Sequence, residues 1–451
     1  MVPERAIKEL KSLYGKRLKD DTSHKLAYSF DATRIEAEPD LVVFPLREEE
    51  IIKTVKLANR YGFPIIPRGS GTGFSGGAVP IKGGVVLSLT KMTKLEIIQE
   101  EMLAVAEPGV ITADLQREAE KKGLFYPPDP ASLKNSTIGG NIAENSGGPR
   151  CLKYGVTKNY VLGLDVILPT GERISLGRGL QKNVAGYDLL SLFVGSEGTL
   201  GIVTRAYLRL IPRPALSRSI RADFLTVRDA SEAATDILSS GILPAALEFM
   251  DQRSIEAAAS YLGEKTSAGA SLLIQLDGDE HSVASGIIRV KEVLKRHNVL
   301  EILVSSNDEE EEEVWTLRRS ISPAIASLKP IKVNEDIVVP RSKIPDAVDF
   351  TYNLAEKYSI EVIVFGHMGD GNIHVNFMIE ESERERAGQA VIELFEWVVR
   401  AGGAISGEHG IGITKARFLE LQLGKVQAEI MRKIKHILDP NDIMNPGKIF
   451  K

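Results

Sequence analysis

Apolar positions along the chain change repeatedly between a helical spacing and a strand spacing. Residues 48–62 carry apolar side chains three and four positions apart and end at Gly62, which predicts a helix. Short apolar runs at 63–67 and 85–89 predict strands, because glycine and proline bound them. The same criteria predict a helix at 112–123 and a strand with a hairpin turn at 161–172. We therefore expect residues 1–212 to form an α+β domain with three glycine-rich loops.

Strand and helix patterns alternate regularly beyond residue 212. Such alternation with short connections is typical of a ferredoxin-like α/β sandwich. The predicted strands are 219–225, 245–250, 271–278, 301–305, 331–339 and 361–366, and the predicted helices are 226–240, 252–262, 280–297 and 309–328. A chain of 451 residues is too long for one ordinary core, and the segment "RPALSR" at 213–218 is the predicted domain boundary.

Composition and charge narrow the function classes. The chain carries 56 Lys and Arg against 61 Asp and Glu, a net charge of −5, which argues against a nucleic acid partner. Cys151 is the only cysteine, which excludes an intrachain disulfide and a cysteine-ligated iron–sulfur site. The chain has no 18-residue apolar run and begins without a signal-peptide core. We expect a cytoplasmic protein with no direct membrane span, attached to a membrane only through a partner.

The acidic run "NDEEEEEVW" at 307–315 has two interpretations. Acidic residues are favoured at the positive end of a helix dipole, so the run predicts a solvated helix start. The alternative is a docking patch for a basic electron-transfer partner.

The segment "RGSGTGFSGG" at 68–77 contains glycines at 71, 73 and 76 in the spacing G-x-G-x-x-G. Glycine admits positive φ and a close approach to the backbone, and successive amides of such a loop can bind an anion. A Rossmann loop opens a helix, whereas a second strand follows this loop, and the chain lacks the kinase signatures H-R-D-x-x-x-x-N and D-F-G. The loop therefore predicts a phosphate site on another architecture.

Two segments carry candidate metal chemistry. "VIVFGHMGDGNIHVNF" at 362–377 predicts a hairpin that turns at 369–372, so His367 and His374 are expected to lie opposite each other, with Asn376 on the same side. In "GGAISGEHGIGITK" at 402–415, Glu408 and His409 are a candidate ligand and base. Two histidines and a glutamate with an open position are typical of catalytic zinc. The competing interpretation is that these histidines are ordinary packing residues.

Six motifs in order give the whole chain a resemblance to a known family. They are "PRGSGTGFSGG", "STIGGNIAENSGG", "GYDLLSLFVGSEGTLGIVT", "GHMGDGNIHVNF", "SGEHGIG" and "DPNDIMNPGKIF". Together they resemble FAD-linked oxidases of the vanillyl-alcohol oxidase superfamily, in particular the group of glycolate oxidase flavin subunits, FAD-dependent D-lactate dehydrogenases and D-2-hydroxyglutarate dehydrogenases.

The resemblance implies a fold and a cofactor. The fold class is α+β: a two-subdomain FAD-binding domain at 1–212, a ferredoxin-like cap domain with the metal site at 213–430, and a segment at 431–451 that returns to the FAD domain. FAD is expected to be non-covalent, because no histidine lies between 25 and 280. The residues implied in FAD binding are Arg68, Gly69, Ser70, Gly71, Thr72, Gly73, Gly76, Gly77, Ser136, Thr137, Gly139, Gly140, Asn141, Ala143, Ser146, Glu197, Gly198, Gly201, Ile202 and Asn445.

The resemblance also implies the roles of the reacting residues. His367, His374 and Glu408 would bind a divalent metal, with zinc expected and manganese, iron or cobalt as alternatives, and His409 would be the base. Arg318 would grip the substrate carboxylate. Ser322, Lys332 and Asn376 are further candidates for substrate binding. Members that oxidise 2-hydroxyglutarate have a lysine where this chain has Asn334, which favours a small monocarboxylate.

The implied reaction is oxidation of a small D-2-hydroxy acid, such as D-lactate or glycolate, to the 2-oxo acid. Because one cysteine cannot hold an iron–sulfur cluster, electrons are expected to leave to an external acceptor: an iron–sulfur subunit, an electron-transfer flavoprotein, a quinone or a cytochrome. Two alternatives stay open at this point. One is a related flavoenzyme acting on a sugar acid, lactone or alkyl-phosphate, and the other is a non-catalytic flavin subunit that relays electrons.

Overall fold

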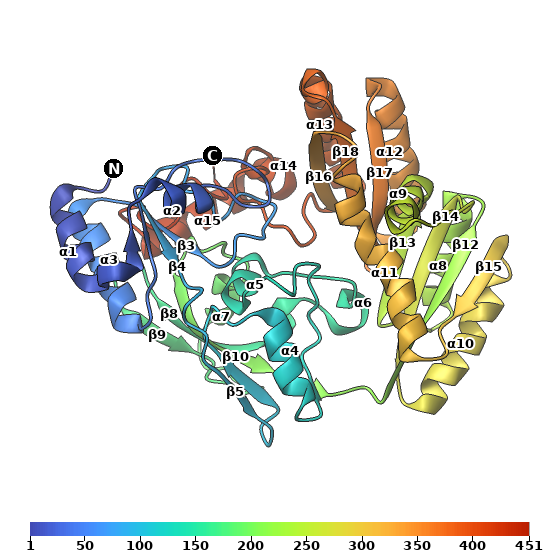
Figure 1. The fold of residues 1–451 in the computed structure, drawn as a ribbon, viewed down its shortest axis with the longest axis horizontal. Coiled ribbons are helices and arrows are strands. Elements are labelled where there is room, and N and C mark those ends of the chain that lie inside the picture. The colour runs from blue at the N-terminus through green and yellow to red at the C-terminus, as the bar shows by residue number, and fades with distance from the viewer. Residues whose placement is uncertain (451) are drawn as a thin grey trace. The chain divides into compact units, whose positions relative to one another are not determined.

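A computed structural model describes residues 1–450 of the chain (Figure 1). These residues form two compact units. The first unit comprises Met1–Gly147, Val156–Arg213 and Glu408–Lys451, and the second comprises Gly148–Gly155 and Pro214–Gly407. The division after Arg213 falls inside the predicted boundary segment. The return to the first unit begins at Glu408, where the sequence suggested 431, and residues 148–155 group with the second unit.

The first unit begins with a four-stranded sheet in the order β1-β2-β4-β3. The neighbours β2, β4 and β3 run parallel, and β1 is antiparallel to β2. Helices α1 and α3 lie side by side next to this sheet (Figure 1) and share one apolar core with it. The elements are α1 (Glu4–Tyr14), β1 (Leu18–Lys19), α2 (Thr22–Ala27), β2 (Leu41–Val43), α3 (Glu48–Tyr61), β3 (Ile65–Arg68) and β4 (Val85–Ser88).

A five-stranded antiparallel sheet in the order β5-β6-β10-β8-β9 forms the other half of the first unit. A two-stranded pair, β11 with β7, accompanies it. The elements are β5 (Leu95–Ile98), β6 (Leu103–Ala106), α4 (Thr112–Glu120), β7 (Leu124–Phe125), α5 (Ile138–Glu144), β8 (Val161–Ile167), β9 (Arg173–Leu176), α7 (Leu190–Phe193), β10 (Ile202–Arg209) and β11 (Ile211–Pro212).

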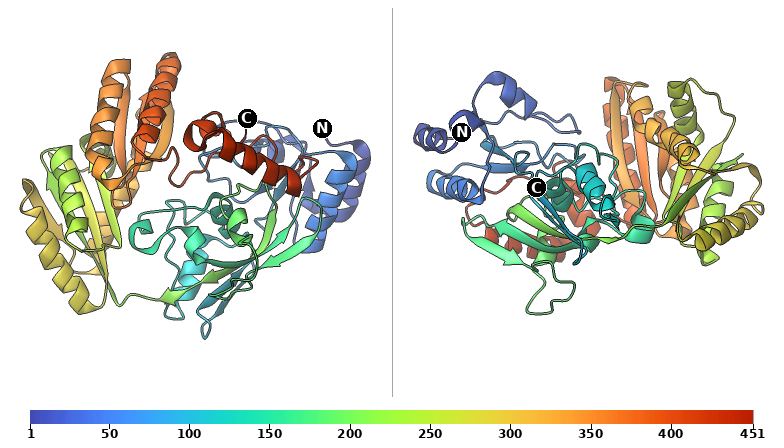
Figure 2. Two further views of the ribbon diagram at one scale, coloured as in Figure 1. Left: turned by 180° about the vertical axis from the view of Figure 1, so that it is seen from behind. Right: turned by 60° about the horizontal axis from the view of Figure 1, so that its bottom comes forward.

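The last 44 residues complete the first unit with two helices and an extended tail. Helices α14 (Leu419–Leu423) and α15 (Lys425–Leu438) are drawn in red in Figure 2. After α15 the chain pairs with β3, because the amide of Ile65 donates to the carbonyl of Ile443 and the amide of Asn445 donates to the carbonyl of Ile65. Asn445 is thereby anchored beside the strand that leads into the glycine-rich loop.

The second unit is built on a seven-stranded antiparallel sheet in the order β15-β12-β14-β13-β17-β18-β16, labelled across Figure 1. Its strands are β12 (Leu216–Phe224), β13 (Ala246–Asp251), β14 (Ala270–Gly278), β15 (Val299–Val304), β16 (Ile331–Val338), β17 (Glu361–His367) and β18 (Asn372–Ile379). Its helices are α6 (Cys151–Tyr154), α8 (Val227–Ser239), α9 (Gln252–Leu262), α10 (Glu280–Leu294), α11 (Asp308–Ile325), α12 (Ile344–Tyr358) and α13 (Arg384–Arg400). Short 3₁₀ turns lie at 15–17, 157–160, 341–343, 381–383 and 416–418 of the chain.

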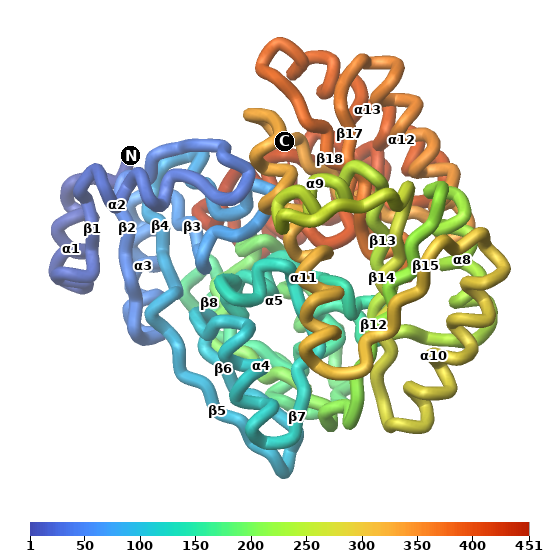
Figure 3. The backbone as a smooth tube through the Cα atoms, turned by 45° about the vertical axis from the view of Figure 1, so that its right-hand side comes forward, coloured from blue at the N-terminus to red at the C-terminus, as the bar shows by residue number. Residues whose placement is uncertain are grey.

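Helices cover both faces of this seven-stranded sheet. Helices α9 and α11 lie beside each other (Figure 3) and share a core with inward-facing strand residues such as Met250, Leu273 and Met378. Helices α8, α10, α12 and α13 pack in a row against the other face, seen from behind in Figure 2. Because side chains alternate along a strand, the residues that share a face with Met250 point towards α9 and α11.

Most predicted elements occur within a few residues of their expected ends, and one segment differs. Residues 136–155 were expected to be loop, yet they contain α5 and α6. Thr137 caps α5, because its side-chain oxygen accepts from the amide of Gly140 at 3.2 Å. Glycine weakens a helix by about 1 kcal/mol per residue, so tertiary packing of Ile138 and Ile142 must compensate for Gly139 and Gly140.

Candidate functional site

The glycine-rich loop leaves β3 at Arg68 and crosses to the parallel strand β4. Gly71 and Gly76 have φ values of +73° and +83°, which side-chain-bearing residues rarely adopt. Within residues 1–450, the amides of residues 69–73 donate no hydrogen bond to the protein. A half-buried run of five such donors is suited to the oxygen atoms of a phosphate.

Arg68 supports this loop from below. The side chain is buried, its Nη1 donates to the carbonyl of Ala78 at 3.3 Å, and its guanidinium lies 5.2 Å from the ring centre of Tyr28. A Cβ atom on Gly71 would lie 2.2 Å from Arg68 Nη2, so a side chain at this position would require the guanidinium of Arg68 to move. Burial lowers the pKa of Arg68 from its ordinary value, against the opposing effect of Asp31.

The loop forms one wall of a cavity within the first unit. Every residue that the resemblance implied in FAD binding lines this cavity except Gly76 and Asn445. Those lining residues are Arg68, Gly69, Ser70, Gly71, Thr72, Gly73, Gly77, Ser136, Thr137, Gly139, Gly140, Asn141, Ala143, Ser146, Glu197, Gly198, Gly201 and Ile202. The three glycine-rich segments, separated by tens of residues in the sequence, therefore face one space.

Gly76 and Asn445 lie behind the cavity wall. A Cβ atom on Gly76 would lie 2.8 Å from Ile413 Cδ1, so this glycine permits close packing against the segment that follows His409. The amide group of Asn445 donates to the carbonyls of Gly77 and Glu197, at 2.9 and 2.8 Å. Its buried Oδ1 has no hydrogen-bond partner among residues 1–450. Asn445 thus joins two of the glycine-rich segments and retains one acceptor for a ligand.

Some of the lining residues were missed by sequence reasoning. Pro130 ends the segment "YPPDP" at 126–130, and Ala131 and Ser132 follow it. Pro108 lies in a turn after β6, and Phe193 is the last residue of helix α7. The segment "YPPDP" was visible as a motif, but nothing in its residue types indicated that it would face a cofactor. Glu408 and His409 line the same cavity.

Glu197 is a buried carboxylate at the wall of this cavity. Its two oxygens accept hydrogen bonds of 2.7 Å from the amides of Ile411 and Gly412. Burial raises the pKa of Glu197 to about 7, although these two amides and the nearby Lys448 act in the opposite direction. Burial likewise lowers the pKa of Lys448 to about 8.

In the second unit, the β17–β18 hairpin brings the two predicted metal-binding histidines together. The sequence predicted that His367 and His374 lie directly opposite each other, and this is wrong. His367 pairs with Asn372, and His374 pairs with Phe365. The histidines are instead diagonal neighbours on one face, with their Nε2 atoms 3.4 Å apart. The four turn residues are 368–371 and not the expected 369–372, and this displacement by one residue moves the partner of His374 from His367 to Phe365.

Glu408 follows Gly407, the last residue of the second unit. Gly407 is fixed by Asp336 on β16, because its amide donates to Asp336 Oδ2 at 2.8 Å. The candidate ligand atoms of His367, His374 and Glu408 all lie within 4.8 Å of one another. Two imidazole nitrogens and a carboxylate oxygen at this spacing fit a divalent transition metal with an open coordination position.

A buried glutamate that sequence reasoning missed connects this cluster to Arg318. Glu248 on β13 is 0% exposed, and its Oε1 accepts from His367 Nδ1 at 2.7 Å. Its Oε2 accepts from Arg318 Nε at 2.8 Å and lies 2.7 Å from Arg318 Nη2 in an ion pair. Burial alone would raise the pKa of Glu248, but His367 and Arg318 outweigh it and hold the pKa below its ordinary value. The one sequence feature that could have indicated this role is a charged residue within the apolar run "AALEFM" at 245–250.

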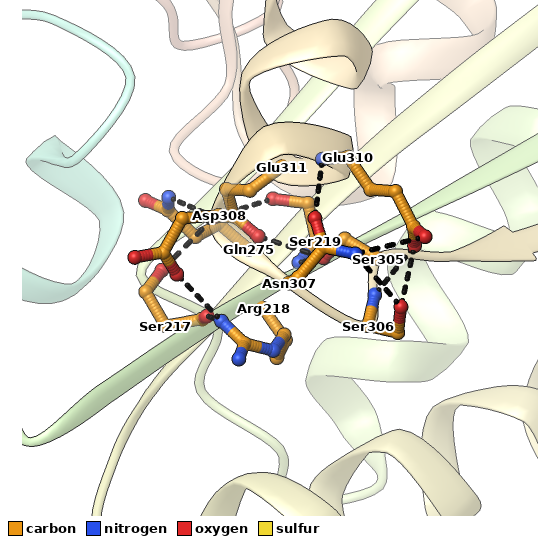
Figure 4. A network of polar contacts seen from close by, with 10 residues as sticks. All are labelled: Ser217, Arg218, Ser219, Gln275, Ser305, Ser306, Asn307, Asp308, Glu310 and Glu311. Atoms are coloured by element: carbon orange, nitrogen blue, oxygen red, sulfur yellow. Dashed lines mark hydrogen bonds and ion pairs between the residues drawn. The ribbon is translucent and has the colours of Figure 1, made fainter.

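Arg318 is positioned by helix α11, whose acidic first turn is tied to the sheet (Figure 4). Glu311 Oε1 accepts from Ser217, Ser219 and Gln275, and its Oε2 accepts from Ser305 Oγ at 2.8 Å. Arg318 lies seven residues later, on the same side of the helix. The acidic run thus begins a helix, as expected, but Glu311 binds the sheet and is not simply solvated.

The remaining predicted substrate residues lie near this face. Lys332 and Asn334 share one side of β16, and Asn334 Nδ2 donates to Asn376 Oδ1 at 2.7 Å. Asn334 Oδ1 is buried and has no hydrogen-bond partner in the part of the chain that the structure describes. Ser322, one turn after Arg318, is exposed. Asn376 is fully buried, on the same face of β18 as His374.

His409, the predicted base, lies in the loop of the first unit that precedes Ile411. Its ring centre is 5.1 Å from that of Phe74, and its Nε2 is 3.7 Å from Glu408 Oε1. The imidazole and the Glu408 side chain are mostly buried, with 17% and 16% exposed. Phe74 of the glycine-rich loop therefore packs against this imidazole.

Comparisons with known proteins agree with this arrangement. Residues 213–449 match the C-terminal domain of FAD-linked oxidases, and residues 39–177 match an FAD-binding domain. The chain belongs to the FAD-linked oxidases. It is 44% identical to glycolate oxidase subunit GlcD of Bacillus subtilis, over 96% of this chain and 93% of that protein. It is 37% identical to a D-lactate dehydrogenase of Anaerostipes hadrus (97% and 94% covered) and 36% identical to a D-2-hydroxyglutarate dehydrogenase of Stutzerimonas stutzeri (98% of each).

Solved structures confirm the predicted fold of this FAD-linked oxidase. A 4-ethylphenol oxidase matches with a TM-score of 0.81 at 19% identity, covering 99% of this chain and 97% of that one. An alkyldihydroxyacetonephosphate synthase matches with a TM-score of 0.78 at 22% identity, covering 99% and 85%. At these identities the likeness establishes the architecture alone. The family match and the relatives together show an oxidoreductase with an FAD-binding domain, and its fold is of the vanillyl-alcohol oxidase type. Within residues 1–450, no helix is long and apolar enough to cross a bilayer.

Proposed function

We propose that this oxidoreductase converts a small D-2-hydroxy acid to the 2-oxo acid. FAD would bind non-covalently in the cavity of the first unit, and a divalent metal, with zinc expected, would bind His367, His374 and Glu408. The chain has the residues for both groups: unpaired loop amides above Arg68, and a donor set of two imidazoles and a carboxylate. The names of the three relatives, each an oxidase or dehydrogenase of such an acid, support the substrate class.

The observation that carries the proposal is the chain of contacts Arg318–Glu248–His367. One carboxylate holds a guanidinium and an imidazole, each at 2.7 Å. A 2-hydroxy acid has a carboxylate next to the carbon that bears its hydroxyl. A site for such an acid needs a guanidinium or similar cation for the carboxylate and, a short distance away, a second polar group for the hydroxyl. The two groups bound by Glu248 are suited to those two parts of the substrate.

Arg318 would bind the substrate carboxylate through its remaining edge. Nε donates to Glu248 and Nη2 forms an ion pair with it, which leaves the Nη1–Nη2 edge for a two-point contact with the substrate. The ring of Phe365, 4.8 Å from the guanidinium, restricts its other movements. Asn334, in place of the lysine of the 2-hydroxyglutarate group, favours a monocarboxylate such as D-lactate or glycolate.

His409 would accept the hydroxyl proton, while the hydrogen on the carbon that bears this hydroxyl would leave with its electron pair. When bound, the flavin supplies the two-electron acceptor and the metal lowers the pKa of the hydroxyl. With Cys151 alone, the chain cannot hold an iron–sulfur cluster, so the electrons pass to an external acceptor such as an iron–sulfur subunit, an electron-transfer flavoprotein, a quinone or a cytochrome.

The test is anaerobic reduction of the bound flavin by matched pairs of D- and L-2-hydroxy acids, with metal content measured on the same preparation. We expect bleaching by D-lactate, and by glycolate, which has no stereocentre, but not by L-lactate. Metal-replete protein whose flavin none of the 2-hydroxy acids reduces would refute the proposal.

A further inference from the structure

We propose that Glu248 is a positioning residue that holds the metal-binding face of His367 and the carboxylate-binding fork of Arg318 in one fixed arrangement. The inference rests on the proposed function for what the two partners bind. The arrangement itself rests on the contacts of one buried side chain. Both oxygens of Glu248 are occupied, and every donor to them belongs to Arg318 or His367.

A purely structural explanation does not account for a carboxylate at this position. Glu248 pairs with His367 across β13 and β17, and its other strand neighbour is Leu273. Replacing a buried ion pair as a whole with apolar side chains is often neutral or stabilising, so packing alone would favour apolar residues at positions 248 and 318 together. Asp251 on the same strand is the contrasting case, because it accepts from the amides of Ser254 and Val364 and caps helix α9.

The first consequence concerns the tautomer of His367. An ionised carboxylate only accepts hydrogen bonds, so Nδ1 of His367 must carry a proton to donate to Glu248 Oε1. In the neutral imidazole the lone pair is then on Nε2, the atom that lies 3.4 Å from His374 Nε2. Such a hydrogen bond from the second ring nitrogen commonly orients metal-binding histidines and raises their basicity.

The second consequence concerns Arg318. Glu248 takes up the Nε–Nη2 edge of the guanidinium, which turns the Nη1–Nη2 edge outward. Glu311 fixes the start of helix α11 seven residues earlier (Figure 4), so the backbone and the tip of Arg318 are held by different contacts. Loss of Glu248 would free the tip without releasing the helix.

The experiment compares Glu248→Gln with the control Asp251→Asn, which removes a buried carboxylate three residues along the same strand. We expect Glu248→Gln to lower Zn²⁺ affinity about 10–100-fold in competition with a chelator and to raise KM for D-lactate about tenfold, with FAD content unchanged. Asp251→Asn should leave both values near wild type. The carboxamide presents an N–H group to one of the two donors, so it cannot satisfy both.

A third measurement needs neither metal nor turnover. Nitrogen NMR of the seven histidines in metal-free, FAD-loaded protein, labelled with ¹⁵N-histidine, reports each tautomer, and His367→Gln assigns the signal. We expect His367 to be protonated at Nδ1 in the wild type and to lose this preference in Glu248→Gln. An unchanged tautomer together with unchanged Zn²⁺ affinity would overturn the inference.

These outcomes separate the inference from the proposed function. A wild-type flavin that no 2-hydroxy acid reduces, together with a changed tautomer in Glu248→Gln, refutes the function and leaves the positioning role. If Glu248→Gln does not fold, Glu248→Asp keeps the charge but is one methylene shorter and reaches only one partner. Wild-type Zn²⁺ affinity and KM in Glu248→Asp would then overturn the inference.

Discussion

Glu197 accepts a hydrogen bond of 2.7 Å from the amide of Gly412, a residue 215 positions later in the chain. The carboxylate also accepts from the amide of Ile411, and its own backbone carbonyl accepts from Asn445. One residue therefore joins three motifs: the "GSEG" loop, the segment after His409 and the C-terminal tail. These two hydrogen bonds fix the backbone of Ile411 and Gly412, which directly follow the loop that carries His409.

The raised pKa of Glu197 predicts a pH dependence of stability. With a folded pKa of about 7 and an ordinary value of 4.5, the folded protein retains a proton that the unfolded chain loses. The free energy of unfolding should therefore fall as pH rises from about 4.5 to 7, by at most about 3 kcal/mol from this group. Glu197→Gln should flatten this slope, which thermal unfolding at constant FAD between pH 4.5 and 8 measures. An identical slope in both proteins would contradict the assignment.

Gly71→Ala should lower FAD occupancy. The added methyl group would lie 2.2 Å from Arg68 Nη2 and displace the side chain that supports the loop. The matched control is Gly62→Ala, which has a similar φ of +70° at the end of α3 but meets no atom within 4 Å. Both variants pay about 1–2 kcal/mol of backbone strain, so only a larger loss of bound flavin in Gly71→Ala supports the phosphate role of the loop. Flavin absorbance per chain is the measurement.

Alanine at His367, His374 or Glu408 should each reduce metal content and turnover while FAD remains bound. The ligands lie within 4.8 Å of one another, so each removal leaves a two-ligand site of much lower affinity. His281→Ala on α10 is the control, because that histidine is exposed in the same unit. Elemental analysis measures the metal content of each variant, and the flavin spectrum measures its bound FAD. Full activity in protein stripped of metal would exclude the metal from the reaction.

His409→Asn should slow flavin reduction by substrate about 10²–10⁴-fold, the usual loss for a general base. Metal and FAD content should stay near wild type, because asparagine retains a side chain of similar extent against Phe74. His436→Asn, on an exposed position of α15, controls for the loss of an imidazole in the same unit. Stopped-flow traces that match the wild type, or a loss of metal in this variant with retention in Glu408→Gln, would show that the roles are assigned wrongly.

Arg318→Lys should mainly raise KM for the 2-hydroxy acid. Lysine cannot donate to Glu248 and present a second fork to the substrate, because it has one nitrogen. An increase of roughly tenfold or more corresponds to the loss of a charged hydrogen bond. The neighbouring Arg319→Lys is the control, since Arg319 pairs with the exposed Glu312. Equal effects of the two substitutions would contradict the carboxylate-binding role.

The sequence by itself determined the local features of the site. Glycine spacing at 68–77 predicted a loop with positive φ, and alternating apolar residues around "GDGN" predicted the hairpin and the shared face of His374 and Asn376. The helix start at 307–315 likewise follows from acidic residues next to a capping asparagine. These features depend on residues within one turn or one pair of strands, where propensity and periodicity act directly.

Only the tertiary structure decided which distant residues meet. The diagonal register of His367 and His374 depends on where the turn lies along the chain, and displacing a turn by one residue changes every pair in a hairpin. The contacts of Glu248 with His367 and Arg318 depend on the pairing of β13 with β17 and on the packing of α11 against the sheet. The helix α5 forms because its apolar side chains are buried, although its glycines disfavour helix. Contacts between residues far apart in the chain depend on packing and burial, which no short segment encodes.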